Sequence, residues 1–401
     1  MVSIGPYHKE KRQLRPMEKY KLLYLQRFLK RREGLDVQSC ISELEKLKDV
    51  ALKCSDDIKY PGNDQFLEML LLDGCFVVEF IRETNEAQPE SRIIKPVGFI
   101  YDQIPRDLML LENQLPFFVL NQLHRMTILD GNELSFAILA KKAFAIYSPK
   151  TSPEALQEIK DKANAGNIKH LLHLIHMSWQ GNPDIDSGSY GKRLCCNLYQ
   201  IICSNGKPKD KEEKVIPNAT ELSEAGVSFT NVGNIYRSSE NDDIGDTSLF
   251  YIKFKNGLIK IPRLQVFDST ESNLRNLIAF EQQSEHHRYF SDFAIIMDHL
   301  IESDKDVNLL RQKGIIDNRI GEDKEVTRIF NQIGKGVSVS DDFYERDGYK
   351  KAIQHCEIPC NRLKASLKHN YFSSLWVGAT VAAIILLILT TIQTVLAFTG
   401  N

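Results

Sequence analysis

Apolar residues recur at helical spacing from near the N-terminus onward. Pro16 and Glu18 are typical of a helix start, because proline suits the first turn and an acid faces the positive end of the helix dipole. The apolar positions that follow predict one buried stripe, made of Met17, Tyr20, Tyr24 and Phe28. An amphipathic helix is predicted over 35–52, and a strongly apolar helix over 65–83, capped by Asp64.

The middle of the chain continues the helical pattern with interruptions. Two Gln-x-Pro motifs end at Pro105 and Pro116, and each proline predicts a helix start or a kink. Segments 132–146 and 153–178 are predicted to be helical, whereas 181–192 and 205–214 have the composition of loops. After Ser269 the helical period returns, with apolar positions at Leu274, Leu277, Ile278, Phe293, Ile296, Leu300, Val326, Ile329, Phe330 and Ile333.

One segment has the alternation of a β-hairpin. In LFYIKFKNGLIKI (residues 249–261), Asn256-Gly257 matches a two-residue turn. Pairing outward from this turn sets Phe254 opposite Ile259 and Ile252 opposite Ile261 on one face, with Lys253 opposite Lys260 on the other. Residues 227–232 could complete a small sheet. The elements do not alternate as βαβ units, which disfavours a Rossmann-type nucleotide-binding fold.

The C-terminal segment is the most hydrophobic part of the chain. Residues 375–398 contain no charged side chain, and 24 helical residues reach about 36 Å, enough for a hydrocarbon layer of ~30 Å. Threonines within it can bond back to the preceding helical turn. We therefore predict a transmembrane helix, represented by Leu375, Trp376, Leu386, Leu387 and Phe398, with Trp376 as an interfacial anchor.

This prediction leads to an expected topology. Basic residues precede the segment, and no apolar secretory signal opens the chain, so we expect a single-pass, tail-anchored membrane protein whose bulk is cytosolic. Whether the membrane is the plasma membrane or an endomembrane stays open. The glycosylation sequon at Asn218 would be unused. The expected fold class is mainly α (α+β): a large multi-helix domain (1–365) with a small antiparallel β-hairpin or sheet at about 227–266, then a juxtamembrane segment (366–374), the transmembrane helix (375–398) and a short tail (399–401).

Charge is unevenly distributed along the chain. The formal net charge of −2 excludes a globally basic nucleic-acid binder, so no nucleic-acid partner is expected. Residues 1–32 nevertheless hold ten Lys or Arg against two Glu, which gives about +8. Within this region Lys19, Lys21, Arg27 and Lys30 are candidates for contact with anionic lipid headgroups. The alternative is an ordinary solvated helix face.

No metal or cofactor site is predicted. The eight cysteines include no Cys-x-x-Cys pair, and a cytosolic protein is not expected to form disulfides. His170, His173 and His176 diverge by about 120° around a helix, which suits the edge of a buried face better than one metal ion. A Walker phosphate loop and a Gly-x-Ser-x-Gly nucleophile elbow are both missing from the sequence.

Acidic residues within apolar helices form the remaining candidate site. Asp73, Glu79 and Glu112 must be paired or protonated if they are buried, and paired carboxylates also perform acid–base chemistry in hydrolases. We expect them to take part in a polar network rather than a catalytic site, because cationic and amide partners lie close by in the sequence. These partners are Arg82, Arg106, Asn113 and Gln114.

Several motifs together resemble the plant family called domain of unknown function 247. They are IGPYH (4–8), LLLDGCFVVEFIR (70–82), DLMLLENQLPFFVL (107–120), ATELSEAGVSF (219–229), IPRLQVFD (261–268), RNLIAFEQ (275–282), DVNLLRQKGIIDN (306–318) and NYFSSLW (370–376). The resemblance covers essentially the whole chain, and it departs only at the start, where family members usually carry extra residues. It implies a largely helical plant protein with one C-terminal membrane helix, and it supplies no catalytic residues.

The expected function is therefore recognition. Some members of the family are encoded at grass self-incompatibility loci, which implies a role in recognition or signalling. We expect a non-enzymatic module that binds protein partners of unknown identity, held at a lipid bilayer. The alternatives are a membrane-bound hydrolase that uses Asp73, Glu79 or Glu112, and a lipid-contacting scaffold that uses the basic N-terminal helix.

Overall fold

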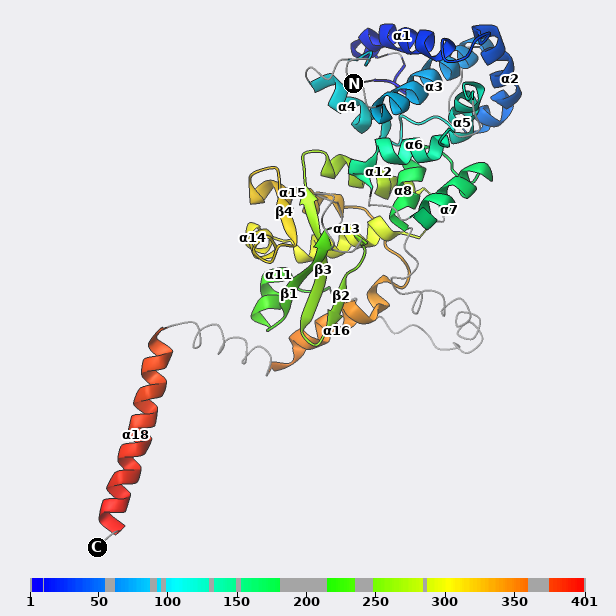
Figure 1. Ribbon diagram of the computed structural model, residues 1–401. Coiled ribbons are helices and arrows are strands. Elements are labelled where there is room, and N and C mark those ends of the chain that lie inside the picture. Colours follow the sequence, from blue (N-terminus) through cyan, green and yellow to red (C-terminus); the bar gives the residue numbers. More distant parts are fainter. Residues whose placement is uncertain are drawn as a thin grey trace, which may run out of the picture.

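The computed structural model describes residues 2–9, 11–54, 62–86, 92–94, 99–129, 133–148, 153–180, 215–234, 248–283, 287–359 and 375–399. Helices predominate over these residues, and a small sheet lies in the second half of the chain (Figure 1). The loops predicted at 181–192 and 205–214 lie outside the described residues, as do Cys195, Cys196, Cys203 and Cys360.

The first half of the described chain is a helical assembly built around one long helix, α3. The elements are η1 (Arg12–Met17), α1 (Glu18–Leu29), α2 (Val37–Lys53), α3 (Asn63–Asn85), α4 (Phe99–Leu108), α5 (Phe117–Met126), α6 (Phe136–Ala143), η3 (Ala145–Tyr147), α7 (Pro153–Asn164) and α8 (Leu171–Gln180). Helix α3 contacts α1, α2, α5 and α6. Because it is surrounded on several sides, almost its whole length from Phe66 to Glu83 is buried.

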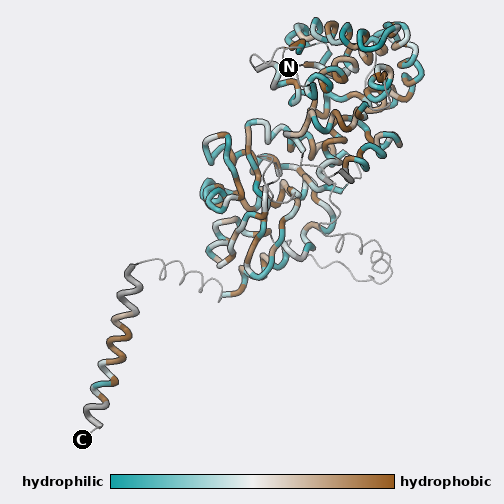
Figure 2. The backbone as a smooth tube through the Cα atoms, viewed as in Figure 1, coloured by the Kyte–Doolittle hydropathy of each residue, from teal (hydrophilic) through white to brown (hydrophobic). Residues whose placement is uncertain are grey.

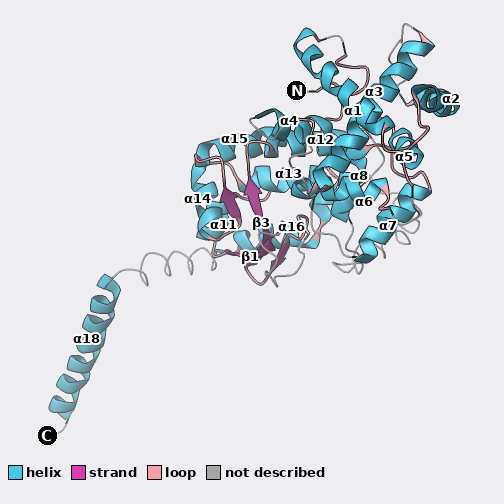
Figure 3. Cartoon of the chain, turned by 45° about the horizontal axis from the view of Figure 1, so that its top comes forward, coloured by secondary structure: helices cyan, strands magenta, loops and turns pink. Residues whose placement is uncertain are grey.

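The second half contains the sheet and the helices that cover it. Its elements are α11 (Ala219–Glu224), β1 (Ser228–Asn234), β2 (Lys253–Lys255), β3 (Leu258–Val266), α12 (Thr270–Gln282), α13 (Tyr289–Leu300), α14 (Asp304–Gln312), β4 (Ile316–Asn318), α15 (Asp323–Ile333), η4 (Phe343–Glu345), α16 (Asp347–Glu357) and α18 (Leu375–Thr399). Figure 3 shows the strands beside α11, α13 and α16, with α18 apart from them.

Strand β3 is the centre of the sheet. It pairs with β2 through the predicted two-residue turn, in which Asn256 and Gly257 both have positive φ, 52° and 74°. The predicted partners Phe254–Ile259 and Lys253–Lys260 face each other as expected. Positive φ at both turn positions is the geometry that matches the natural twist of a hairpin, and it explains the Asn-Gly sequence.

The other two pairings correct the predicted antiparallel sheet. Both β1 and β4 run parallel to β3. Parallel neighbours need crossover connections rather than tight turns. Between β3 and β4 the chain passes through α12, α13 and α14, which supply such a crossover. The prediction of a purely antiparallel element was wrong because the hairpin signal is local, whereas the parallel pairings join segments that are distant in sequence.

Helix boundaries differ from the predicted ones where glycine or proline intervenes. The segment predicted over 153–178 is two helices, α7 and α8, separated at Gly166, whose φ is 74°. Pro105 lies inside α4, and Pro116 is the N-cap of α5. At the start of α3, Gly62 is the N-cap, and Asp64 lies in the first turn.

Aromatic side chains fill the interface between α1 and α3. Tyr24 packs edge-on against Phe76 with ring centroids 5.0 Å apart, and Phe76 stacks on Phe80 at 6.0 Å. Tyr24, Phe28, Phe76 and Phe80 are all at most 1% exposed. Figure 2 shows hydrophobic and hydrophilic positions alternating along the outer helices of this half, as expected of helices with one buried face. The predicted stripe of α1 is therefore the face that lies on α3.

Helix α18 coincides with the predicted transmembrane segment. Its threonines bond back as expected, with the Thr391 hydroxyl donating to the Leu387 and Ile388 carbonyls at 2.9 and 2.8 Å. Leu386 and Leu387 are 62% and 66% exposed. The side chains of Leu375, Trp376 and Phe398 lie outside the described set.

The membrane assignment itself needs correction. Among the described residues, no helix is both long enough and apolar enough to cross a membrane. The prediction of a single-pass, tail-anchored membrane protein is therefore wrong for the part of the chain that the structure describes. Residues 366–374 and 400–401 lie outside that part.

Gly74 offers a test of the packing between α3 and α5. A Cβ atom at this position would lie 2.4 Å from Leu123 Cδ1, and Leu123 is fully buried. Gly74→Ala is expected to destabilise the protein by about 1–3 kcal/mol through overpacking, despite the better helix propensity of alanine. The matched control is Gly348→Ala in α16, where the nearest atom is 3.7 Å away. Urea unfolding followed by circular dichroism should show a loss for Gly74→Ala alone, and equal midpoints for both variants would contradict this packing.

Candidate functional site

Helix α1 has two faces of opposite character. The inner face carries Lys21, Tyr24 and Phe28, which are 2%, 0% and 0% exposed. The outer face lies open to solvent and carries Lys19, Leu22, Leu23, Gln26 and Lys30. These five outer residues fall within about 100° of one another around the helix, so they form a single stripe, called here the outer stripe. Leu22 and Leu23 are 52% and 45% exposed.

A buried ion pair anchors the inner face near its start. Lys21 Nζ donates to Asp73 Oδ1 at 2.6 Å, and both side chains are at most 5% exposed. Burial alone would lower the pKa of Lys21, but the charges of Asp73 and Glu18 outweigh it, so the pKa is raised. Lys21 is therefore a charged group held inside the protein.

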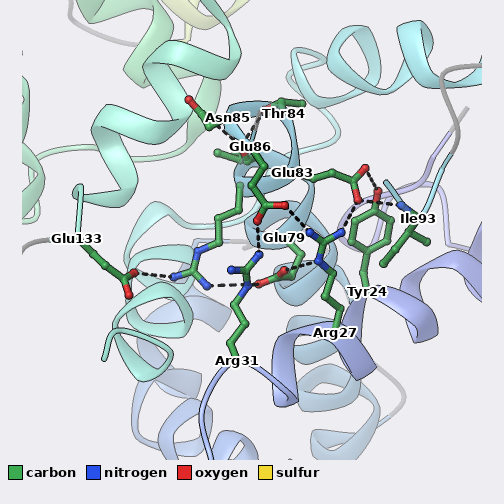
Figure 4. Close-up of polar contacts among 12 residues, drawn as sticks. Tyr24, Arg27, Arg31, Glu79, Glu83, Thr84, Asn85, Glu86, Ile93 and Glu133 are labelled. Atoms are coloured by element: carbon green, nitrogen blue, oxygen red, sulfur yellow. Dashed lines mark hydrogen bonds and ion pairs between the residues drawn. The ribbon is translucent and has the colours of Figure 1, made fainter. Parts of the chain in front are cut away.

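A denser charge cluster lies about two helical turns further along α1 (Figure 4). Arg27 contacts Glu83 at 2.8 Å and Glu86 at 2.5 Å. Arg31 contacts Glu79 at 2.6 Å and Glu86 at 2.9 Å. Glu79 and Glu83 are fully buried, while the arginines and Glu86 reach solvent in part. The cluster thus joins α1 to α3 by charge-assisted hydrogen bonds, which are the strong kind.

Tyr24 and the segment after α3 complete the surroundings of Glu83. The Tyr24 hydroxyl donates to Glu83 Oε1 at 2.9 Å, and the backbone N–H of Ile93 donates to Glu83 Oε2 at 3.0 Å (Figure 4). With Arg27, both oxygens of this buried carboxylate are therefore satisfied. This carboxylate has a structural role, because it is fully buried and both of its oxygens already accept hydrogen bonds.

Arg82 extends the cluster from α3 to α5. It contacts Glu79 at 3.3 Å and lies 2.9 Å from His124 Nδ1. Since arginine can only donate, His124 Nδ1 must accept, and His124 Nε2 then donates to the Leu134 carbonyl at 3.1 Å. Burial and the neighbouring Arg82 charge lower the pKa of His124 to about 4. His124 is consequently neutral at neutral pH and is held in one tautomer.

The predicted polar network is divided among separate places. Glu79 and Arg82 do meet, as the sequence indicated. Asp73 instead pairs with Lys21, and Asn113 binds the N-terminal segment. Gln114 ties down two carbonyls of its own loop, those of Leu108 and Leu110.

The remaining two candidates do not meet each other. Glu112 is 68% exposed and pairs with His8 at 3.1 Å. Arg106 is half-buried and makes no ion pair with Glu112 within the described residues. The three candidate carboxylates therefore do not converge on one cleft.

The four basic candidates also separate into two kinds. Lys21 forms an ion pair with Asp73, and Arg27 forms ion pairs with glutamates of α3. Lys19 and Lys30 are exposed on the outer stripe. Leu22 and Leu23 were not predicted from the sequence as functional residues. Their signal was present, since both are apolar yet fall on the side of the helix opposite to the Met17–Tyr24–Phe28 stripe.

Comparison with known proteins identifies the family. The model of a family described as plant protein of unknown function, domain of unknown function 247, matches residues 1–389. The chain belongs to this family.

Two proteins of Arabidopsis thaliana resemble this family member along most of their length. The UPF0481 protein At3g47200 is 27% identical over an alignment of 399 positions that covers 98% of this chain and 80% of that protein. The UPF0481 protein At3g02645 is 24% identical over an alignment of 411 positions, gaps included, that covers 84% of this chain and 75% of that protein. No solved structure matches significantly.

Three histidines at the start of α8, with His170 just before the helix and His173 and His176 within it, are packed rather than arranged around a metal. The rings of His170, His173 and His176 all lie 5.1–5.3 Å from the ring of Phe280 on α12. Burial, with a smaller effect of Lys169, lowers the pKa of His170 to about 4. No group of three His, Cys, Asp or Glu side chains suited to a metal occurs among the described residues. The three-residue spacing of these histidines instead places their rings around the ring of Phe280 on α12.

Two buried hydroxyl pairs resemble parts of a hydrolase site but are closed. Lys141 Nζ donates to Ser148 Oγ at 2.6 Å, and burial lowers the pKa of Lys141 to about 8. Both residues are at most 5% exposed, so no substrate reaches them in this conformation. Glu281 accepts from Ser291 Oγ at 2.8 Å and contacts His176 at 2.9 Å. Here the serine is bonded to the carboxylate rather than to the histidine, which is not the arrangement that activates a nucleophile.

Glu79 is the residue whose removal should most disturb the charge cluster. Glu79→Gln leaves Arg31 and Arg82 with less compensation in a buried place, and we expect about 3 kcal/mol of destabilisation. Glu45→Gln, which breaks a surface pair with Lys48 in α2, is the control and should cost less than about 1 kcal/mol. Urea titration of both variants measures the difference. Similar losses would mean that the cluster does not contribute as buried ion pairs do.

His124 makes stability depend on pH. Its pKa is about 4 in the folded protein, below the ordinary value of 6.5. The unfolded state therefore binds the additional proton, and stability falls as pH drops from about 6.5 to about 4. The expected loss is on the order of 3 kcal/mol at the acid end. In that pH window, His124→Gln should lower by about one the number of protons taken up on unfolding, as measured by the slope of the unfolding free energy against pH. An unchanged slope would contradict the assignment.

Proposed function

We propose that this protein is a non-enzymatic recognition module that binds a protein partner through the outer stripe of α1. The observation that carries the proposal is the pair of exposed leucines, Leu22 and Leu23, between exposed lysines on an ordered helix. An apolar centre with a charged rim is the usual anatomy of a protein–protein interface.

The rigid support of this helix strengthens the proposal. Lys21 and Arg27 on the other faces of α1, and Arg31 just beyond its end, are bound to carboxylates of α3. The outer stripe is therefore presented in a fixed orientation before any partner arrives. Preorganisation of this kind lowers the entropic cost of association.

Charge complementarity indicates the chemistry of the partner. The exposed basic side chains of this region are Lys9, Lys11, Arg12, Arg15, Lys19, Lys30 and Arg32. The acidic residue of α1, Glu18, is half-buried and already paired with Lys21. A partner surface with an apolar pocket surrounded by Asp or Glu would complement both features.

The hydrolase alternative has less support. Glu79 is fully buried among arginines, Asp73 is paired with Lys21, and Glu112 lies apart at the surface. A general acid or base needs a reachable carboxyl group beside the substrate. Within the described residues, these three carboxylates do not come together at one site that a substrate could reach.

A charge-and-shape variant tests the outer stripe. We expect Leu22→Glu/Leu23→Glu in the full chain to abolish recovery of specific proteins from plant extract, since each buried leucine contributes about 1.5–3 kcal/mol and the new acids repel an acidic partner. Val50→Glu, at a position on α2 that is 54% exposed, is the matched control. Recovery by the wild type should also fall steeply at high salt.

Two outcomes would count against the proposal. One is equal recovery of the same proteins by the outer-stripe variant and the Val50→Glu control. The other is that wild-type chain binds anionic vesicles in preference to any protein and loses this binding in the outer-stripe variant, which would favour a lipid-contacting scaffold instead. Quantitative mass spectrometry of parallel captures and vesicle flotation distinguish the two.

A further inference from the structure

A short segment near the start of the chain is bound in an unusual way. Residues Val2, Ser3 and Ile4 are 3%, 2% and 1% exposed, yet they belong to no helix or strand. Within the described residues the backbone of 2–5 makes hydrogen bonds to side chains and none to other backbone groups. This is the reverse of the usual pattern, since about two-thirds of protein hydrogen bonds join backbone to backbone.

Asp107 and Asn113 form hydrogen bonds with the backbone along one edge of the segment. Val2 N donates to Asp107 Oδ2 at 2.6 Å. Asn113 then binds twice, accepting from Ile4 N at 2.6 Å and donating to the Val2 carbonyl at 3.2 Å. In an extended chain the polar groups of alternate residues point to the same side. The side-chain amide of Asn113 can therefore bind Val2 and Ile4 at once, because their backbone groups point to the same side of the extended segment.

Lys21 and Asp73, the buried ion pair, form hydrogen bonds with the backbone along the opposite edge. Lys21 Nζ donates to the Ser3 carbonyl at 2.6 Å, and Gly5 N donates to Asp73 Oδ2 at 2.8 Å. Lys21 and Asp73 also bind each other. Five backbone groups of four consecutive residues are therefore held from two sides by four side chains of the helical body.

The side chains of the segment define what fits. Val2 and Ile4 are apolar and enclosed. The Ser3 hydroxyl is buried, and no described group hydrogen-bonds to it, so a small side chain is accommodated there without being recognised. Gly5 has a φ of 73°, and a Cβ there would lie 3.2 Å from the Gln114 carbonyl oxygen. The place thus accepts apolar, small, apolar and glycine in that order.

From this geometry we propose that Asp73, Lys21, Asp107 and Asn113 form a peptide-binding groove, and that the chain's own residues 2–5 occupy it as a tethered ligand. The ligand class is an extended peptide with two β-branched apolar residues around a small one, followed by glycine. Capture of extended backbone by fixed polar groups is a recurring mode of peptide recognition. This site lies on the inner side of α1 and does not depend on the outer stripe.

Tethering explains why the groove is filled in the intact chain. A segment joined by a short linker has an effective concentration on the order of millimolar at its own site. A free peptide must exceed that concentration to compete. Cutting the tether therefore reveals the intrinsic affinity without removing any residue from the body.

The test uses the full chain with a protease site inserted between Lys9 and Glu10. After cleavage, a fluorescent peptide of residues 1–9 (MVSIGPYHK) is added, and its binding is followed by fluorescence anisotropy. We expect saturable binding to the cleaved chain and at least 100-fold weaker apparent binding to the uncleaved chain. A peptide with Ser3→Ala should bind equally well, whereas Gly5→Ala should bind at least tenfold more weakly.

Variants in the peptide leave the protein unchanged, so their effects cannot arise from misfolding. Asn113→Ala in the cleaved chain should weaken binding at least tenfold with helical content preserved, and Leu22→Glu/Leu23→Glu should leave it unchanged. The proposal is overturned if the cleaved chain unfolds, if it stays folded but neither releases its segment nor binds the peptide, or if the two peptide variants bind alike. Circular dichroism and native mass spectrometry separate these cases.

Discussion

Buried ionic contacts between α1 and α3 determine how the N-terminal half of this protein is arranged. Lys21 meets Asp73 at one level, Tyr24 meets Phe76 at the next, and Arg27 and Arg31 meet the glutamates of α3 beyond them. A shift of one helical turn would leave several buried charges without partners, which is far costlier than losing an apolar contact. The pairing therefore fixes both the register of the two helices and the rotation of α1.

The rotation of α1 determines which of its side chains are exposed to solvent. The first 32 residues carry a formal charge of about +8, but Lys21, Arg27 and Arg31 are compensated by carboxylates of α3. The positive charge that remains exposed lies on residues 9–15, on Arg32, and on the outer stripe beside its two leucines. A count of charges along the sequence overstates the basic surface and does not show that an apolar strip crosses it.

The sequence predicted those features that depend on neighbours along the chain. Met17, Tyr24 and Phe28 lie on the buried face, and Asn256-Gly257 makes the hairpin turn. It did not predict features that depend on distant segments. The parallel pairing of β1 with β3 is one example, and the packing of His170, His173 and His176 around Phe280 is another.

The candidate site shows the same division. Glu79 and Arg82 lie three residues apart on one helix, and their contact was predictable from helical spacing. Asp73 was expected to find a partner nearby, but Lys21 comes from another helix, and only the register of Lys21 with Met17, Tyr24 and Phe28 hinted that this lysine is buried. The transmembrane prediction rested on the apolar length of residues 375–398, and no helix among the described residues is long and apolar enough to cross a membrane.

Lys21 links the extended N-terminal segment to the packed pair of helices α1 and α3. Its ammonium contacts Ser3, Glu18 and Asp73, so it holds the extended segment and the helix pair at the same time. A movement of α1 large enough to separate Lys21 from Asp73 also removes a donor from the Ser3 carbonyl. Occupancy of the groove and the position of α1 are therefore thermodynamically linked. A ligand that favours one arrangement of α1 must change the affinity of the groove by the same factor by which the groove changes the affinity of that ligand.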